Sequence, residues 1–156
     1  MKKTSKHQGF TLVELLIVIV VIGVLSAMMM LSSTEAVSSA KASNIVSDLR
    51  NMKTAALAYY VDNLDTYKDS NKLKNINSVT PKDALAKYMG NGQLPDNANL
   101  VNNSNETEWY VYLPVTDARV ADKLDARKTS VGLYAAATSN DKSTITTNTG
   151  AYMYVR

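Results

Sequence analysis

The sequence predicts an α+β fold in which a long N-terminal α-helix packs on a small antiparallel β-sheet head. Residues 10–31 form an apolar run, residues 32–62 contain neither proline nor glycine, and the final third alternates apolar and polar residues as strands do. We therefore expect a helix with a membrane-spanning half at residues 10–31 and an amphipathic half at residues 32–62. The globular α/β head, with a C-terminal sheet, follows at residues 63–156.

The first half of the helix is long enough to cross a bilayer, because at about 1.5 Å per residue Phe10 to Leu31 spans roughly 33 Å. Three lysines precede this run, and basic residues hold the adjoining end of a membrane helix in the cytoplasm. The run also contains one carboxylate, Glu14. Its ionised form costs on the order of 2.5–3.5 kcal/mol on insertion scales, so we expect a partner that neutralises it.

The second half of the helix carries an apolar stripe whose members recur every three or four residues, the period of one helix face. We expect this stripe and the single tryptophan to form the core of the head, with the residues Ile45, Leu49, Met52, Ala56, Tyr59 and Trp109. Within the apolar half, Gly23 and Ser26 are small and permit close approach of another helix.

Polar residues fill the chain after Asp62 until a short helix at residues 80–89. Thr80 is a suitable N-cap, Pro81 suits the first helical position, and Gly90 follows as a stop signal. Residues 91–105 are rich in asparagine and predict turns.

The final third predicts three strands and one more helix. Residues 109–113 alternate in a strand ended by Pro114, and Thr116 is the expected cap of a helix from Asp117 to about Arg127. Strands at residues 131–137 and 151–155 complete an antiparallel sheet of three or four strands, laid against the apolar stripe.

The chain reads Gly-Phe-Thr-Leu-Val-Glu-Leu over residues 9–15, after a short basic leader. This pattern closely resembles the cleavage and methylation signature of type IV pilin-like proteins, which comprise type IV pilins, type II secretion pseudopilins and competence pilins. By this resemblance residues 1–9 are a leader peptide that ends at Gly9, Phe10 becomes the N-methylated N-terminus, and Glu14 guides assembly. Members share the pilin-like helix-on-sheet fold. Many carry proline at the position of Leu31, where this chain does not.

The resemblance implies a structural subunit of a type IV pilus-like helical filament, a homo-oligomer with no enzymatic activity. It implies processing by a prepilin peptidase, assembly by inner-membrane pilus machinery, and residence in the cytoplasmic membrane, N-terminus inside, before incorporation into a surface or periplasmic filament. Two alternatives stay open: a type II secretion pseudopilin, and a non-polymerising single-span membrane-anchored binding module. A secretory signal peptide fits poorly, because its core is shorter and lacks a carboxylate.

Composition argues against other functions. The chain has no cysteine, and its single histidine, His7, would leave with the leader, so no catalytic residue is nominated. The net charge of +3 disappears with Lys2, Lys3 and Lys6, leaving 14 basic against 14 acidic residues, so nucleic-acid binding is not predicted. The C-terminal aspartates match no cation-loop spacing, and we expect neither a metal nor a cofactor. They are Asp117, Asp122, Asp125 and Asp141.

Overall fold

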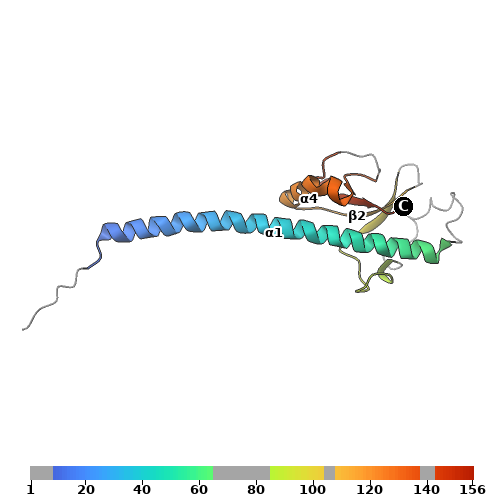
Figure 1. The fold of residues 1–156 in the computed structure, drawn as a ribbon, viewed down its shortest axis with the longest axis horizontal. Coiled ribbons are helices and arrows are strands. Elements are labelled where there is room, and N and C mark those ends of the chain that lie inside the picture. The colour runs from blue at the N-terminus through green and yellow to red at the C-terminus, as the bar shows by residue number, and fades with distance from the viewer. Residues whose placement is uncertain (1–8, 65–84, 104–107, 138–142) are drawn as a thin grey trace, which may run out of the picture. The chain divides into compact units, whose positions relative to one another are not determined.

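A computed structural model describes residues 9–64, 85–103, 108–137 and 143–156 (Figure 1). The chain forms two compact units, Met1–Val37 and Ser38–Arg156, which are described here separately. The elements in chain order are α1 (Leu12–Asp62), β1 (Asn99–Asn102), β2 (Trp109–Leu113), α4 (Ala118–Val131), β3 (Leu133–Tyr134) and β4 (Ala151–Tyr154). The predicted α+β fold, a long helix with an antiparallel sheet, is confirmed.

The first unit contains the apolar part of α1. The helix begins at Leu12, two residues later than the predicted Phe10, because Thr11 acts as its N-cap. Among the described residues, α1 alone is long and apolar enough to cross a membrane. Its most apolar window has a mean hydropathy of 2.8 and is 0% buried. The helix passes Leu31 without a break, as expected for a position that lacks proline.

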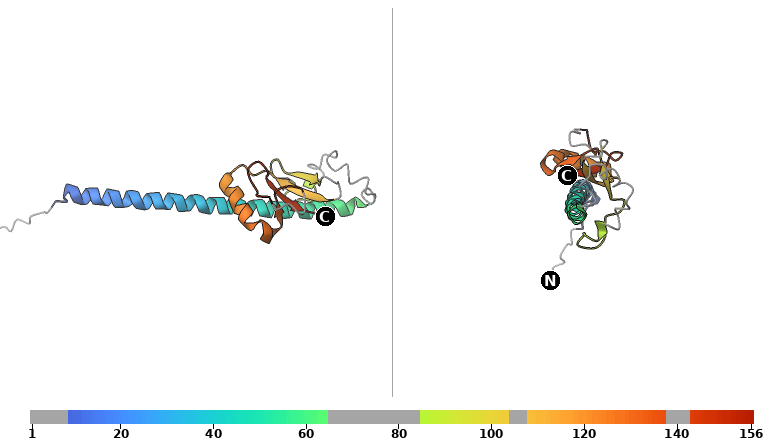
Figure 2. Two further views of the ribbon diagram at one scale, coloured as in Figure 1. Left: turned by 90° about the horizontal axis from the view of Figure 1, so that it is seen from above. Right: turned by 90° about the vertical axis from the view of Figure 1, so that its right-hand side faces the viewer.

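The second unit is built on the remaining part of α1. Leu49, Met52 and Ala56 are fully buried there, together with Trp109 of β2. Ile45 and Tyr59 are half-buried and pack against this core. Figures 1 and 2 show the sheet and α4 on one side of this helical segment, while residues 85–98 lie on another side of it.

The sheet has four antiparallel strands in the order β1-β2-β4-β3. The predicted strand at 109–113 is β2, and Val111 of β2 pairs with Met153 of β4. The prediction of turns throughout 91–105 was wrong, because Asn99–Asn102 pairs with β2 as the edge strand β1. The third predicted strand is much shorter than 131–137, since Val131 still belongs to α4 and only Leu133–Tyr134 pair with β4.

Helix α4 is longer than predicted and has a different cap. Asp117, not Thr116, is the N-cap, because its carboxylate accepts a hydrogen bond from the Arg119 N–H at 3.0 Å. The helix continues beyond Arg127 to Val131 and ends at Gly132, whose backbone is left-handed and whose N–H donates to the Lys128 carbonyl oxygen. Its buried face includes Val120 and Leu124, the two apolar positions that the sequence indicated.

The predicted short helix at 80–89 lies mostly outside the described residues, as do Thr80 and Pro81. Of its described part, Leu85 and Ala86 are helical, and a turn follows up to Gly90. Leu85 is fully buried in the core.

Candidate functional site

The start of α1 brings together the residues that the sequence nominated for cleavage and assembly. Gly9, Phe10, Thr11 and Glu14 line one open hollow in the first unit. Phe10 is 83% exposed and is not among the buried core residues. The arrangement follows from helix geometry, because residues three apart at a helix start lie on the same side of the first turn.

Thr11 and Glu14 form a reciprocal capping pair. The Thr11 N–H donates to Glu14 Oε2 at 2.8 Å, and the Thr11 hydroxyl donates to the same oxygen at 2.7 Å. In return, the Glu14 N–H donates to Thr11 Oγ1 at 3.2 Å. This is the capping-box arrangement, in which the first orphan N–H groups of a helix are satisfied by two side chains.

The capping pair fixes the direction of the Glu14 carboxylate. Both hydrogen bonds from Thr11 reach Oε2, and among the described residues Oε1 receives none. A carboxylate offers about four acceptor positions, so this group keeps capacity for a further donor. The hydrogen bonds therefore hold the carboxylate at the N-terminal end of α1, against Thr11.

Thr11 is the site residue that sequence reasoning missed. Its signal was present, since threonine followed three residues later by glutamate, just before an apolar run, is the sequence signature of a capping box. From the sequence alone, Glu14 is a charge that needs an external partner. The structure adds an internal partner within the same turn.

The other nominated residues lie elsewhere. Gly23 and Ser26 are exposed on α1, and a Cβ added at Gly23 would meet nothing within 4 Å, so their role in helix packing stays a prediction. Lys2, Lys3, Lys6 and His7 lie outside the described residues, as does Asp141.

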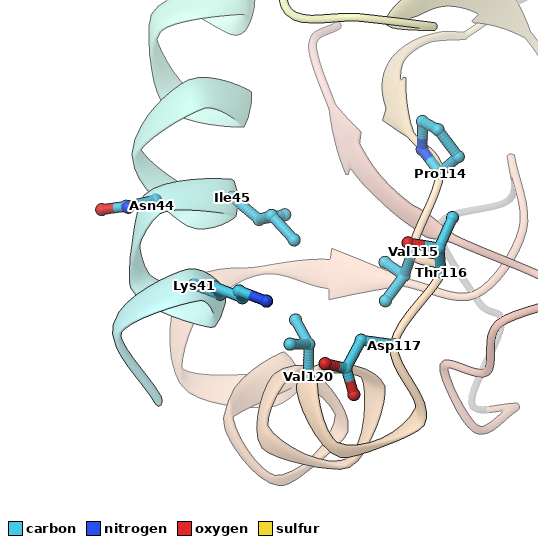
Figure 3. A pocket seen from close by; sticks show the side chains of 8 residues that line it. All are labelled: Lys41, Asn44, Ile45, Pro114, Val115, Thr116, Asp117 and Val120. Carbon is cyan, nitrogen blue, oxygen red and sulfur yellow. The ribbon is translucent and has the colours of Figure 1, made fainter. Parts of the chain in front are cut away.

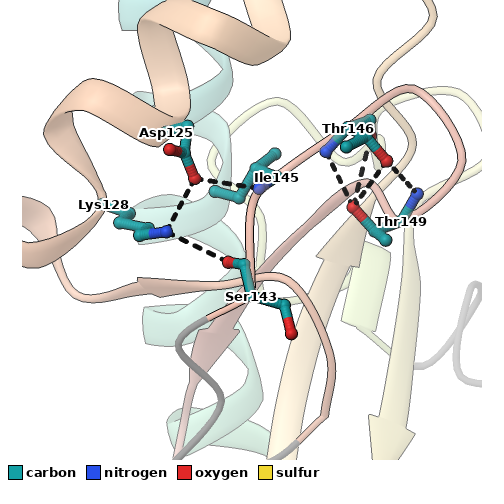
Figure 4. Close-up of polar contacts among 6 residues, drawn as sticks. All are labelled: Asp125, Lys128, Ser143, Ile145, Thr146 and Thr149. Carbon is teal, nitrogen blue, oxygen red and sulfur yellow. Dashed lines mark hydrogen bonds and ion pairs between the residues drawn. The ribbon is translucent and has the colours of Figure 1, made fainter.

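No group of three or more histidine, cysteine, aspartate or glutamate side chains lies together within the described parts of the chain. Asp117 caps α4, and Asp125 accepts hydrogen bonds from Lys128 Nζ and from the Ile145 N–H (Figure 4). These two carboxylates therefore serve local structure.

Comparison with known protein families gives a match at the N-terminal end of the chain. Residues 4–30 match the family model described as the prokaryotic N-terminal methylation motif. The matched range includes the whole hollow at residues 9–14 and most of the apolar run. No curated protein and no solved structure matches the chain.

Proposed function

We propose, from the type IV pilin-like family that the N-terminal methylation motif indicates, that this chain is a structural subunit of a type IV pilus-like helical filament. One observation carries the proposal. The motif at residues 4–30 coincides with an apolar helical window of which no part is buried within the chain. Proteins of this family are generally structural and not enzymatic.

The motif implies processing by a prepilin peptidase, and we place the cut between Gly9 and Phe10. Cleavage there would remove the basic leader and create an α-amino group on Phe10, beside the hollow that Thr11 and Glu14 line. Methylation of that amine preserves its ability to carry a positive charge. The product would be a helix that begins with an amine and a carboxylate within one turn of each other.

Assembly would pair these opposite charges between neighbouring subunits. Glu14 Oε2 is engaged by Thr11, while Oε1 faces no donor among the described residues, so the amine of an adjacent copy can bind it. In a water-poor environment an uncompensated carboxylate is costly, and pairing removes that cost. The charge pair would then set the register between neighbouring helices. The apolar side chains would make the contact between them, with Gly23 and Ser26 where the two helices approach most closely.

Glu14→Ala tests this mechanism, with Glu14→Gln as the matched variant. Glutamine keeps an acceptor for the Thr11 donors but carries no charge, whereas alanine removes both. We expect both variants to insert, to be cleaved, and to yield few filaments in sheared surface fractions relative to the membrane pool. Intact mass of wild-type filament protein should show loss of residues 1–9 and one added methyl group.

Two results would contradict the proposal. Full-length chain recovered from filaments would exclude the cut at Gly9, and a normal filament yield from Glu14→Ala would exclude the intersubunit role of Glu14. A normal yield from Glu14→Gln alone would mean that capping of α1, rather than charge, is the contribution of this residue.

A further inference from the structure

Three consecutive methionines stand near the end of the apolar run, and we call them the methionine triplet: Met28, Met29 and Met30. Their side chains are 66%, 72% and 77% exposed on α1. At about 100° per residue, three consecutive side chains span roughly 200° around a helix. The triplet therefore presents thioether sulfur over more than half of the circumference of α1.

The position of the triplet along the helix matches the far edge of a bilayer. Counted from Phe10 at about 1.5 Å per residue, the triplet lies roughly 27–30 Å along the chain, which is close to the thickness of the hydrocarbon core. The basic leader is expected in the cytoplasm, which puts the triplet at the opposite, outer interface of the membrane. Small solutes outside the cell membrane can reach side chains at that interface.

Polar residues mark the same boundary. Ser33 and Thr34 follow the triplet closely, and their hydroxyls donate to the carbonyl oxygens of Met29 and Met30 at 3.2 and 3.0 Å. Glu35 then supplies the first charge after the apolar run, and its side chain is exposed. A charged side chain is costly in hydrocarbon, so the membrane boundary falls between the triplet and Glu35.

The methionines of the second unit are more sheltered. Met52 and Met153 are 0% and 4% exposed in its core, and Met89 is half-buried. A pocket of about 280 Å³ opens between α1, the segment after β2, and α4, but the residues that line it include no methionine (Figure 3). A small oxidant that enters this pocket meets no thioether, so among the described methionines the triplet is the most accessible.

We propose that the methionine triplet is a site of oxidation by peroxides, and that its oxidation withholds the subunit from the filament. Hydrogen peroxide transfers one oxygen atom to the thioether sulfur, so the sulfur is oxidised to a sulfoxide while the peroxide is reduced to water. The product is a polar side chain in place of an apolar one. The inference rests on the proposed filament function and adds a control over entry into the filament.

An oxidised triplet remains compatible with the membrane. Without the triplet the apolar run is reduced to residues 10–27, which span roughly 27 Å against a hydrocarbon core of about 30 Å. Thinning of the bilayer accommodates a mismatch of this size at modest cost, and interfacial water can donate hydrogen bonds to the sulfoxide oxygens. The oxidised subunit should therefore stay in the membrane pool.

The same sulfoxide oxygens are costly between packed helices. In the proposed filament the apolar side chains of the run contact one another, and a polar oxygen buried there loses the hydrogen bonds that water supplied. The hydroxyls of Ser33 and Thr34 cannot replace that water, because each already donates to the helix backbone. Oxidation thus shifts the subunit from the filament toward the membrane pool.

Exposure of intact cells to hydrogen peroxide during expression tests the proposal, with the triple variant Met28→Leu, Met29→Leu, Met30→Leu as the resistant chain. Leucine keeps the run apolar at similar volume and has no sulfur. Without peroxide, both chains should give equal filament yields in sheared surface fractions. At a dose that adds oxygen to the triplet, measured by peptide mass spectrometry, the wild-type yield should fall by about tenfold or more relative to the membrane pool. The yield of the triple-leucine variant should not fall.

The control chain carries Met52→Leu and Met153→Leu, which remove buried sulfur and keep the triplet. It should lose filaments to peroxide as the wild type does. Equal losses from the wild type and the triple-leucine variant would overturn the proposal, and so would wild-type filaments of normal yield whose subunits carry the sulfoxides. Both results would leave the proposed function standing, whereas absence of filaments from untreated wild-type cells would reject the proposed function itself.

A second measurement needs no oxidant. The triple variant Met28→Gln, Met29→Gln, Met30→Gln places polar oxygens at the triplet directly. We expect cleavage and membrane level to be unchanged and most filaments to be lost, in contrast to the triple-leucine variant. Equal filament yields from the glutamine and leucine variants would overturn the proposal.

Discussion

At the scale of single residues, Gly150 shows how backbone conformation and packing can demand the same amino acid. Its φ is +70°, a region that side chains other than glycine adopt at a cost. A Cβ added there would also collide with the Tyr112 ring and lie 2.9 Å from the Leu113 carbonyl oxygen. Gly150 stands immediately before β4, so the requirement concerns the approach of β4 to β2.

Gly150→Ala should therefore destabilise the head by roughly 2–4 kcal/mol, the sum of a strained φ and a steric clash. Gly92→Ala is the matched control, because Gly92 has φ +67° but a Cβ there meets nothing within 4 Å. We expect it to cost about 1 kcal/mol. Urea denaturation of a chain that begins at Ser38 measures both, and equal losses would show that the contact with Tyr112 is unimportant.

The sequence draws attention to Phe10 and Glu14 more readily than to the residues beside them. Phe10 and Glu14 stand out because an apolar run that contains one acid is unusual. Thr11 is less conspicuous, since threonine is common and its role appears only when its three hydrogen bonds to Glu14 are seen. In the same way, Asp117 and Thr116 are both good caps in sequence, and only the backbone conformation at Asp117 selects it.

At the scale of elements, α4 is tied to the segment before β4 by a polar connection (Figure 4). Lys128 Nζ donates to Asp125 Oδ1 at 2.8 Å and to the Ser143 carbonyl oxygen at 3.1 Å, while the Ile145 N–H donates to the same Asp125 oxygen at 2.9 Å. Ile145 is thereby anchored in the core. The connection consists of hydrogen bonds and one ion pair, with Lys128 Nζ and Asp125 Oδ1 at its centre.

Asp125→Asn should weaken this connection in a pH-dependent way. Burial tends to raise the pKa of Asp125, but the Lys128 and Ile145 hydrogen bonds and the Lys128 charge together lower it. Because the folded-state pKa lies below the unfolded value of about 3.9, the ionised carboxylate stabilises the fold above that value. That contribution is lost as pH falls through the folded-state pKa.

We expect Asp125→Asn to reduce the free energy of unfolding by about 1 kcal/mol at neutral pH, with the difference from wild type shrinking below about pH 4. Asp122→Asn, which removes an exposed charge from the same helix, should change little. Urea denaturation at several pH values measures both. A difference that stays constant down to pH 2 would argue against the ionic contribution.

Element prediction succeeded where local pattern and tertiary context agree. β2 consists of aromatic and aliphatic residues, which favour strands, and its observed limits are those predicted. β1 was missed because Asn99 and Asn102 favour turns, and its pairing with β2 is a tertiary effect that no local signal reports. β3 was overestimated because the apolar residues near 131–137 are divided between the end of α4, two strand residues and a bend.

At the scale of the whole molecule, the chain divides between Val37 and Ser38. The first unit exposes apolar side chains along the described part of its helix, whereas the second has a continuous buried core. The boundary lies beyond the predicted limit of the membrane-spanning half at Leu31 and within the predicted amphipathic half. The second unit thus contains the core contacts that a folded domain requires.

A chain that begins at Ser38 should therefore be soluble and folded, with both helix and strand in its circular dichroism spectrum. Leu49→Asp should unfold it, because Leu49 is fully buried and an unpaired charge there costs several kcal/mol, comparable with the stability of a small domain. Ser47→Asp, at an exposed position of the same helix, should leave the spectrum unchanged. A folded Leu49→Asp chain would mean that the core is not organised around α1.

The burial of Trp109 gives the head an intrinsic optical probe. It is the single tryptophan of the chain, and all nine tyrosines also lie after Val37, so the first unit contributes no indole or phenol emission. Trp109 belongs to β2, and its ring forms a T-shaped pair with the ring of Tyr60 on α1, with centroids 5.5 Å apart. Ultraviolet fluorescence therefore reports whether the sheet remains packed on the helix. It could follow the head, without any label, in lipid vesicles and in intact fibres alike.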